Sequence, residues 1–164
     1  MKRPILRALA AAGIAAVPSP ASAADPRATL ADLEARLARL GAARIEGTDT
    51  VDGRTVPALH FGEHRINNRY AVVDAIRRAH GATATVFVRD GDDFVRISTN
   101  VLTQDGRRGV GTRLARNAAH EAVSAGRPYC GSLDVQGARF ESCYGPIRDA
   151  AGAVIGVGYV GHRR

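Results

Sequence analysis

Two predicted strands and the loop that follows them carry the polar residues best suited to holding a small molecule. The candidates are Phe87, Arg96, Ser98, Thr99 and Asn100. An arginine fork with hydroxyl and amide donors beside it suits a planar carboxylate, and an aromatic ring accepts a short apolar tail. The alternative is that Arg96 is a solvated strand residue or pairs with a nearby acid, since arginine side chains are mostly exposed.

A second predicted hairpin carries aromatic residues that could complete such a site. Tyr129 and Tyr144 stand at the strand ends. We expect them to line the mouth of a pocket, because a buried phenol needs a hydrogen-bond partner. Phe140 and Leu133, on the same face, are better explained as core packing.

Other kinds of chemistry find little support in the residue pattern. His60 and His64 could bind a metal from one face of a helix, but the local pattern predicts a strand and a turn. The chain has no G-x-S-x-G motif and no nucleophile with a base beside it. The sequence therefore indicates no metal site, no cofactor and no enzyme.

Four arginines surround the glycine-rich stretch DGRRGVGTRLAR; they are Arg107, Arg108, Arg113 and Arg116. Amides at a helix start can hold an anion there. A solvated loop is the more ordinary explanation. The stretch also lacks the Lys-Ser/Thr ending of a phosphate loop.

The only two cysteines fall opposite one another in the second hairpin. A two-residue turn at residues 136–137 sets a register that pairs Cys130 with Cys143. We predict a cross-strand disulfide at a non-hydrogen-bonded position, contributing about 2–4 kcal/mol. Polar neighbours on its face place it on the wetter side. A redox-active pair would more typically occupy a C-x-x-C motif at a helix start.

The first 23 residues have the pattern of a secretory signal peptide. Lys2 and Arg3 precede an apolar run over residues 6–17, and the triplet ASA at residues 21–23 offers a cleavage site. The run is shorter than the roughly 20 residues of a membrane span, and an uncleaved anchor is the alternative. We expect one exported domain over residues 24–164, periplasmic or secreted.

Composition excludes several classes of protein. The chain has 164 residues, 45% hydrophobic and 24% charged, a mixture typical of a globular domain. Its formal net charge is +7, but acids are interleaved with the arginines and no basic stripe carries aromatic residues. Nucleic acid is therefore not an expected partner.

The spacing of apolar residues predicts an α+β fold, an antiparallel sheet with helices packed on it. Helices are expected over residues 26–40, 69–79 and 114–125, and single strands over residues 55–61 and 154–160. The first helix has a leucine face of Leu30, Leu33, Leu37 and Leu40. The second is capped by Asn67 and Asn68 and turns Ala71, Val72, Ala75 and Ile76 inward.

The first hairpin has a register that follows from its turn at residues 90–93. The expected pairs are Thr85 with Ser98, Val86 with Ile97, Phe87 with Arg96 and Val88 with Val95. One face is then apolar, while the other mixes aromatic, hydroxyl and guanidinium groups.

The order and spacing of several segments resemble a Cache-type sensor domain of the single, Cache 3/Cache 2 fusion kind. The segments are INNRYAVVDAIRRAHGATATVFVRDGDDFVRISTNV, GTRLA, GRPYCG and YGPIRDAAGAVIGVGYVG. The resemblance covers residues 27–161. It implies a five-stranded antiparallel PAS-like sheet, a long N-terminal helix across one face and a ligand pocket on the other.

The resemblance also implies a sensory rather than catalytic function, related to chemotaxis. We expect a small organic anion, such as a short carboxylate, between the sheet and the loop of residues 99–111. The sequence shows no second membrane segment and no output domain, so a membrane receptor, a sensor kinase or a homodimer would transmit the signal. The alternative is an interaction protein that uses the leucine face of its first helix for dimerisation or docking.

Overall fold

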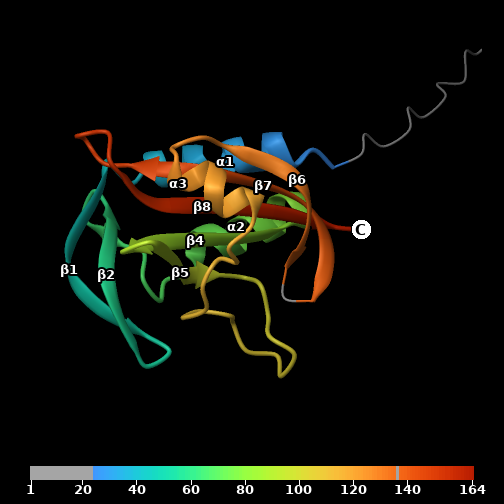
Figure 1. The fold of residues 1–164 in the computed structure, drawn as a ribbon, viewed down its shortest axis with the longest axis horizontal. Coiled ribbons are helices and arrows are strands. Elements are labelled where there is room, and N and C mark those ends of the chain that lie inside the picture. Colours follow the sequence, from blue (N-terminus) through green and yellow to red (C-terminus); the bar gives the residue numbers. More distant parts are fainter. Residues whose placement is uncertain (1–23, 136) are drawn as a thin grey trace, which may run out of the picture.

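The computed structural model describes residues 24–135 and 137–164, so the predicted signal peptide lies outside the described residues. The elements are α1 (Pro26–Ala38), β1 (Ala43–Val51), β2 (Arg54–Phe61), β3 (His64–Arg65), α2 (Ala71–His80), β4 (Thr83–Asp90), β5 (Asp93–Thr99), α3 (Ala118–Ser124), β6 (Tyr129–Val135), β7 (Ala138–Arg148) and β8 (Val154–Arg163). Figure 1 shows their arrangement.

Five strands form an antiparallel sheet in the order β5-β4-β8-β7-β6. Helices α1 and α2 pack on one face, here called the helix face. The segment of residues 100–117 and α3 cover the opposite face, here called the loop face. The predicted α+β architecture with a five-stranded antiparallel sheet is therefore confirmed.

Helix α1 forms as its sequence predicts. The Asp25 carboxylate accepts a hydrogen bond from the Arg27 amide at 2.9 Å, and Pro26 occupies the first turn. The side chains of Leu30, Leu33 and Leu37 are 7%, 0% and 2% exposed because they pack on the sheet. These three leucines are thus buried inside the domain, which argues against the use of the leucine face as a dimerisation or docking surface.

Helix α2 differs from its prediction at its start and on its inward face. Asn67 is not a cap, because its side chain accepts from the Leu59 amide and donates to the Pro57 carbonyl, tying it to β2. Tyr70 holds the N-cap position without a side-chain hydrogen bond. The buried residues are Val73 and Ile76. Of the four predicted inward residues, Ile76 is buried and Val72 packs partly buried against the core, whereas Ala71 is exposed and the buried Val73 was not predicted.

A separate three-stranded sheet, β1-β2-β3, forms a hairpin-like extension at one end of the molecule (Figure 1). The sequence indicated only its middle strand. β1 was missed because its burial pattern leaves seven consecutive residues at least partly exposed, so it lacks a continuous apolar signal.

Helix α3 is seven residues long, shorter than predicted. Asn117 caps it, accepting hydrogen bonds from the amides of Ala119 and His120. The residues before Asn117 are extended: the amide of Leu114 donates to the carbonyl of Phe94 at 2.9 Å. These residues lie alongside β5 and cannot be helical at the same time.

The first hairpin contains a β-bulge that the predicted register lacks. Phe87 pairs with Arg96 as expected, but Val86 then pairs with Ser98 and Thr85 with Thr99. The predicted pairs Thr85–Ser98 and Val86–Ile97 were therefore wrong. The extra residue reverses the side-chain alternation beyond it, because a one-residue slip moves every later side chain to the other face.

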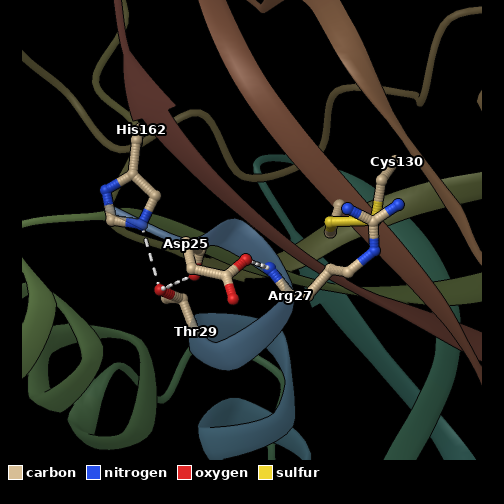
Figure 2. Close-up of a disulfide and its surroundings, with 6 residues drawn as sticks. Asp25, Arg27, Thr29, Cys130 and His162 are labelled. Carbon is tan, nitrogen blue, oxygen red and sulfur yellow. Dashed lines mark hydrogen bonds between the residues drawn. A yellow bond between two sulfur atoms is a disulfide. The ribbon is translucent and has the colours of Figure 1, made fainter. Parts of the chain in front are cut away.

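The second hairpin has the predicted register, with Cys130 opposite Cys143. The two cysteines form a disulfide, and their Cα atoms are 4.1 Å apart. The disulfide is not on a wet face, however. Cys143 is 0% exposed within the helix-face core, and the partly buried Cys130 packs against that core. Figure 2 shows the disulfide beside the first turn of α1.

We predict that the disulfide stabilises the folded domain substantially. Replacing Cys130 and Cys143 together by alanine should lower the free energy of unfolding by about 2–3 kcal/mol, because the bridge closes a loop of modest length in the unfolded chain. Urea denaturation measures this. Reductant should destabilise the wild type but not the double variant; equal sensitivity of both proteins would contradict the assignment.

His162 joins the end of β8 to the start of α1. Its Nε2 lies 3.0 Å from the hydroxyl of Thr29, which in turn donates to the carbonyl of Asp25 (Figure 2). Burial, with a contribution from the nearby His80, lowers the pKa of His162 from 6.5. The folded state therefore favours the neutral imidazole.

Acidification should weaken the protein through His162. Its contribution to stability is complete above pH 6.5 and is lost as the pH falls through the lowered pKa, since the unfolded state then binds the proton first. His162→Asn should therefore show a smaller fall in melting temperature between pH 7.5 and 5 than the wild type. The hydrogen bond with His80 lowers the pKa of Asp32 below 3.8, so the Asp32 carboxyl does not titrate in this window. Parallel pH profiles would contradict the prediction.

Candidate functional site

Arg96 is a buried cation on the loop face of the sheet. It lies on β5, an edge strand, yet is only 7% exposed. Its guanidinium carbon stands 4.9 Å from the ring centre of Phe87, its cross-strand partner. This cation–π contact replaces part of the hydration that the charge has lost.

The segment over residues 111–114 buries Arg96 by pairing with β5. The Arg96 amide donates to the Thr112 carbonyl, and the Gly111 amide donates to the Arg96 carbonyl, each at 2.8 Å. Arg96 Nη1 also donates to the Thr112 hydroxyl at 3.0 Å and to the Arg113 carbonyl at 3.1 Å. Backbone and side chain together hold the segment over the edge of the sheet.

The charge of Arg96 is nevertheless incompletely satisfied. Its Nε is buried without a hydrogen-bond partner, and within residues 24–135 and 137–164 no carboxylate forms an ion pair with it. Burial lowers the pKa of Arg96, but an arginine remains protonated at neutral pH. A buried, unpaired cation is costly and attracts an anion.

A cavity of about 200 Å³ opens beside this guanidinium. Its wall combines the edge of β5, the segment over residues 112–117 and the facing strands β6 and β7. The lining residues are Arg96, Thr112, Arg113, Leu114, Ala115, Asn117, Asp134, Val135 and Tyr144. The cavity therefore offers one buried cation, several hydrogen-bonding groups and an apolar wall.

Two neutral tyrosines stand near the cation. The rings of Tyr144 and Tyr159 are 4.9 Å apart, and the Tyr159 hydroxyl lies 3.1 Å from the Thr83 hydroxyl. Burial raises the pKa of both phenols above the usual value of 10. Both stay protonated at physiological pH, so Tyr144 faces the cavity as an uncharged hydrogen-bonding group.

The structure brings together some of the predicted site residues. Arg96 and Tyr144 line the cavity, and Phe87 lies against the guanidinium. Thr99 is buried, and its hydroxyl lies 2.7 Å from that of Thr85. Tyr129 packs at the edge of the loop-face core without lining the cavity.

Ser98 and Asn100 do not share the site, because the β-bulge turns them toward the helix face. The Ser98 hydroxyl donates to the Arg69 carbonyl. The Asn100 amide donates to the carbonyls of Val73 and Ala82, fastening α2 to the sheet. The expectation that Ser98 shares the face of Arg96 was therefore wrong, and Asn100, expected just beyond it, contacts α2 instead of the cavity.

The residues that close the cavity could not be found from local patterns. Thr112 and Asn117 gave no signal because their place depends on the path of the segment after β5, and Asp134 gave none because it depends on where β6 lies relative to that segment. Tyr159 could have been found, since glycines alternate with Val157 and Tyr159 along β8. Gly158 faces α1, where an added Cβ would lie 3.4 Å from Leu33, so the larger residues must face the other way.

The four arginines of the glycine-rich stretch are all engaged by carboxylates. Arg107 pairs with Asp105, Arg108 with Asp74, and both Arg113 and Arg116 with Asp93. These pairs hold the segment in place. In the described part of the chain, no three His, Cys, Asp or Glu side chains are grouped as a metal site would require.

The family described as the Cache 3/Cache 2 fusion domain matches residues 28–164. The chain belongs to this family. Cache domains are extracellular modules that sense small molecules. No curated protein matches the chain. Among the described residues of this Cache domain, no helix has the length and apolar character needed to cross a membrane.

We predict that Arg96 contributes little to the stability of the empty protein. Arg96→Met removes an unpaired buried charge and keeps most of the side-chain volume, so the free energy of unfolding should change by less than about 1 kcal/mol. Leu114→Ala, which removes a 3% exposed side chain from the same cover, should cost about 2–4 kcal/mol. Chemical denaturation measures both. A loss of about 3 kcal/mol in Arg96→Met would mark the arginine as structural.

Proposed function

We propose that this Cache domain is exported to the periplasm or secreted and binds a small organic anion, such as a short carboxylate, at Arg96. The observation that carries the proposal is the guanidinium that is buried beside a cavity without a carboxylate partner. A ligand carboxylate would supply the missing negative charge. Planar carboxylates match the guanidinium fork, and such charge-assisted hydrogen bonds are about twice as strong as neutral ones.

The volume of the cavity limits the size of the ligand. At about 30 Å³ for each water-sized unit, 200 Å³ holds about six or seven heavy atoms. A carboxylate with a two- to four-carbon body is of this size. Leu114 and Val135 would contact the carbon chain, and Tyr144 and Asn117 would offer hydrogen bonds to a second polar group.

Asp134 borders the cavity from β6, but its side chain does not neutralise Arg96. Along β6 it alternates with Val135, which packs in the loop-face core, and its carboxylate is 72% exposed and 4.0 Å from Arg139. Small amino acids carry the same carboxylate as the simple acids, so they belong in the same ligand screen.

The segment over residues 111–114 is the part of the domain best placed to respond to a ligand. The Arg96 guanidinium, which lines the cavity, donates hydrogen bonds to the Thr112 hydroxyl and the Arg113 carbonyl of this segment. A ligand that draws on the same guanidinium changes the balance of these contacts. The segment connects onward to α2, where Arg108 forms two hydrogen bonds with the Asp74 carboxylate. A membrane receptor, a sensor kinase or a second copy of the chain would detect the change there.

A thermal-shift screen of short carboxylates and small amino acids tests the proposal. At a hundredfold excess over its dissociation constant, a ligand should add about 2.7 kcal/mol to the free energy of unfolding. Arg96→Met should abolish this gain because it removes the only buried cation of the cavity.

Arg89→Met is the matched control for this screen. Arg89 also lies over a phenylalanine, 5.6 Å from the ring centre of Phe94, but does not line the cavity. It should respond to the ligand as the wild type does. Equal stabilisation of Arg96→Met and the wild type, or no stabilisation by any compound of the screen, would overturn the proposal.

A further inference from the structure

A second cavity, larger than the one beside Arg96, lies on the helix face. Its volume is about 640 Å³, and β2, β3, the start of α2 and strands β4 and β5 surround it. Leu40, Ile66, Val72 and Val86 give it an apolar wall. Val86 comes from the strand that carries Phe87, so the two cavities lie on opposite faces of the same pair of strands. This volume is within the range of pockets that bind organic ligands.

Basic groups without acidic partners border this cavity. Arg69 forms no ion pair within residues 24–135 and 137–164. His60 Nδ1 is buried and has no hydrogen-bond partner there. The two nearby acids do not neutralise Arg69, because Asp49 pairs with Arg65 at 3.4 Å and Glu63 is 97% exposed and pairs with Arg44. The cavity therefore has an excess of positive charge and an unsatisfied polar atom.

The start of α2 adds to this positive potential. Ala71 and Val72, the first two residues of the helix, line the cavity, and Tyr70 makes no side-chain cap hydrogen bond. The first amides of a helix lack partners within it, and its dipole is positive at this end. The Ser98 hydroxyl, turned to this face by the β-bulge, fixes the Arg69 carbonyl at the cavity edge.

We propose that the helix-face cavity binds an amphipathic organic anion, with an aromatic or medium-chain aliphatic body and one carboxylate or sulfonate. The body fills the apolar part, and the anionic group lies near Arg69, His60 and the start of α2. At about 30 Å³ for each water-sized unit, 640 Å³ accepts a body of ten or more heavy atoms. This ligand is larger than the Arg96 cavity admits, so the site is distinct from the one proposed above.

Titration of the purified protein with decanoate by calorimetry, and with 8-anilinonaphthalene-1-sulfonate by fluorescence, tests this site. Both probes should bind saturably, at one site, and compete with each other. Ala71→Trp, which fills the cavity from an exposed helix position, and Arg69→Gln, which removes the unpaired charge, should each lower the affinity at least tenfold.

Matched variants separate this site from general effects and from the Arg96 site. Ala79→Trp lies at the other end of α2, and Arg39→Gln removes a charge beyond α1; both positions are exposed and outside the cavity. Both variants should bind decanoate as the wild type does, and so should Arg96→Met. No saturable binding, or equal loss in the test and control variants, would overturn the proposal. Loss of decanoate binding in Arg96→Met would assign the probe to the other cavity and overturn it as well.

Discussion

A positive charge held out of water beside an open cavity is the constraint on which the proposed binding site of this domain depends. Arg96 lies on an edge strand, where an arginine would ordinarily extend into solvent. It is buried because the segment over residues 111–114 pairs with that edge and covers it. The ring of Phe87 and two hydrogen bonds compensate for only part of the lost hydration. The described residues thus leave the charge of Arg96 without a carboxylate partner, which is the basis of the proposed anion site.

Strands β4 and β5 contribute side chains to both faces of the sheet. The single extra residue of the β-bulge decides which side chains of β5 face which side. Without the β-bulge next to Phe87, Ser98 would stand beside Arg96, as the sequence suggested. With it, Ser98 holds the Arg69 carbonyl at the helix-face cavity, and Thr99 moves to the loop face beside Thr85. Bulges occur often beside binding sites because they redirect side chains in this way.

Ion pairs of the arginines that follow β5 hold the segment of residues 100–117 in place over the loop face of the sheet. Arg108 forms two hydrogen bonds with Asp74, and its guanidinium carbon lies 4.2 Å from the ring centre of Tyr70. A two-point contact of this kind fixes orientation as well as distance. It ties the cover of the Arg96 cavity to α2, the helix whose start borders the second cavity. The two proposed sites are therefore connected through the contacts of Arg108 with Asp74 and Tyr70.

The sequence by itself determined the elements whose signals are local. Asp25 and Pro26 define the start of α1, the leucine spacing defines its buried face, and the two-residue turn fixes the register that joins Cys130 to Cys143. Tertiary structure decided the rest. The burial of Cys143 depends on where α1 crosses the sheet, and the bulge depends on how β5 meets β4 and its cover. The site is assembled from strands and a segment far apart in the chain. Local sequence rules describe neighbours along the chain, whereas a cavity is defined by neighbours in space.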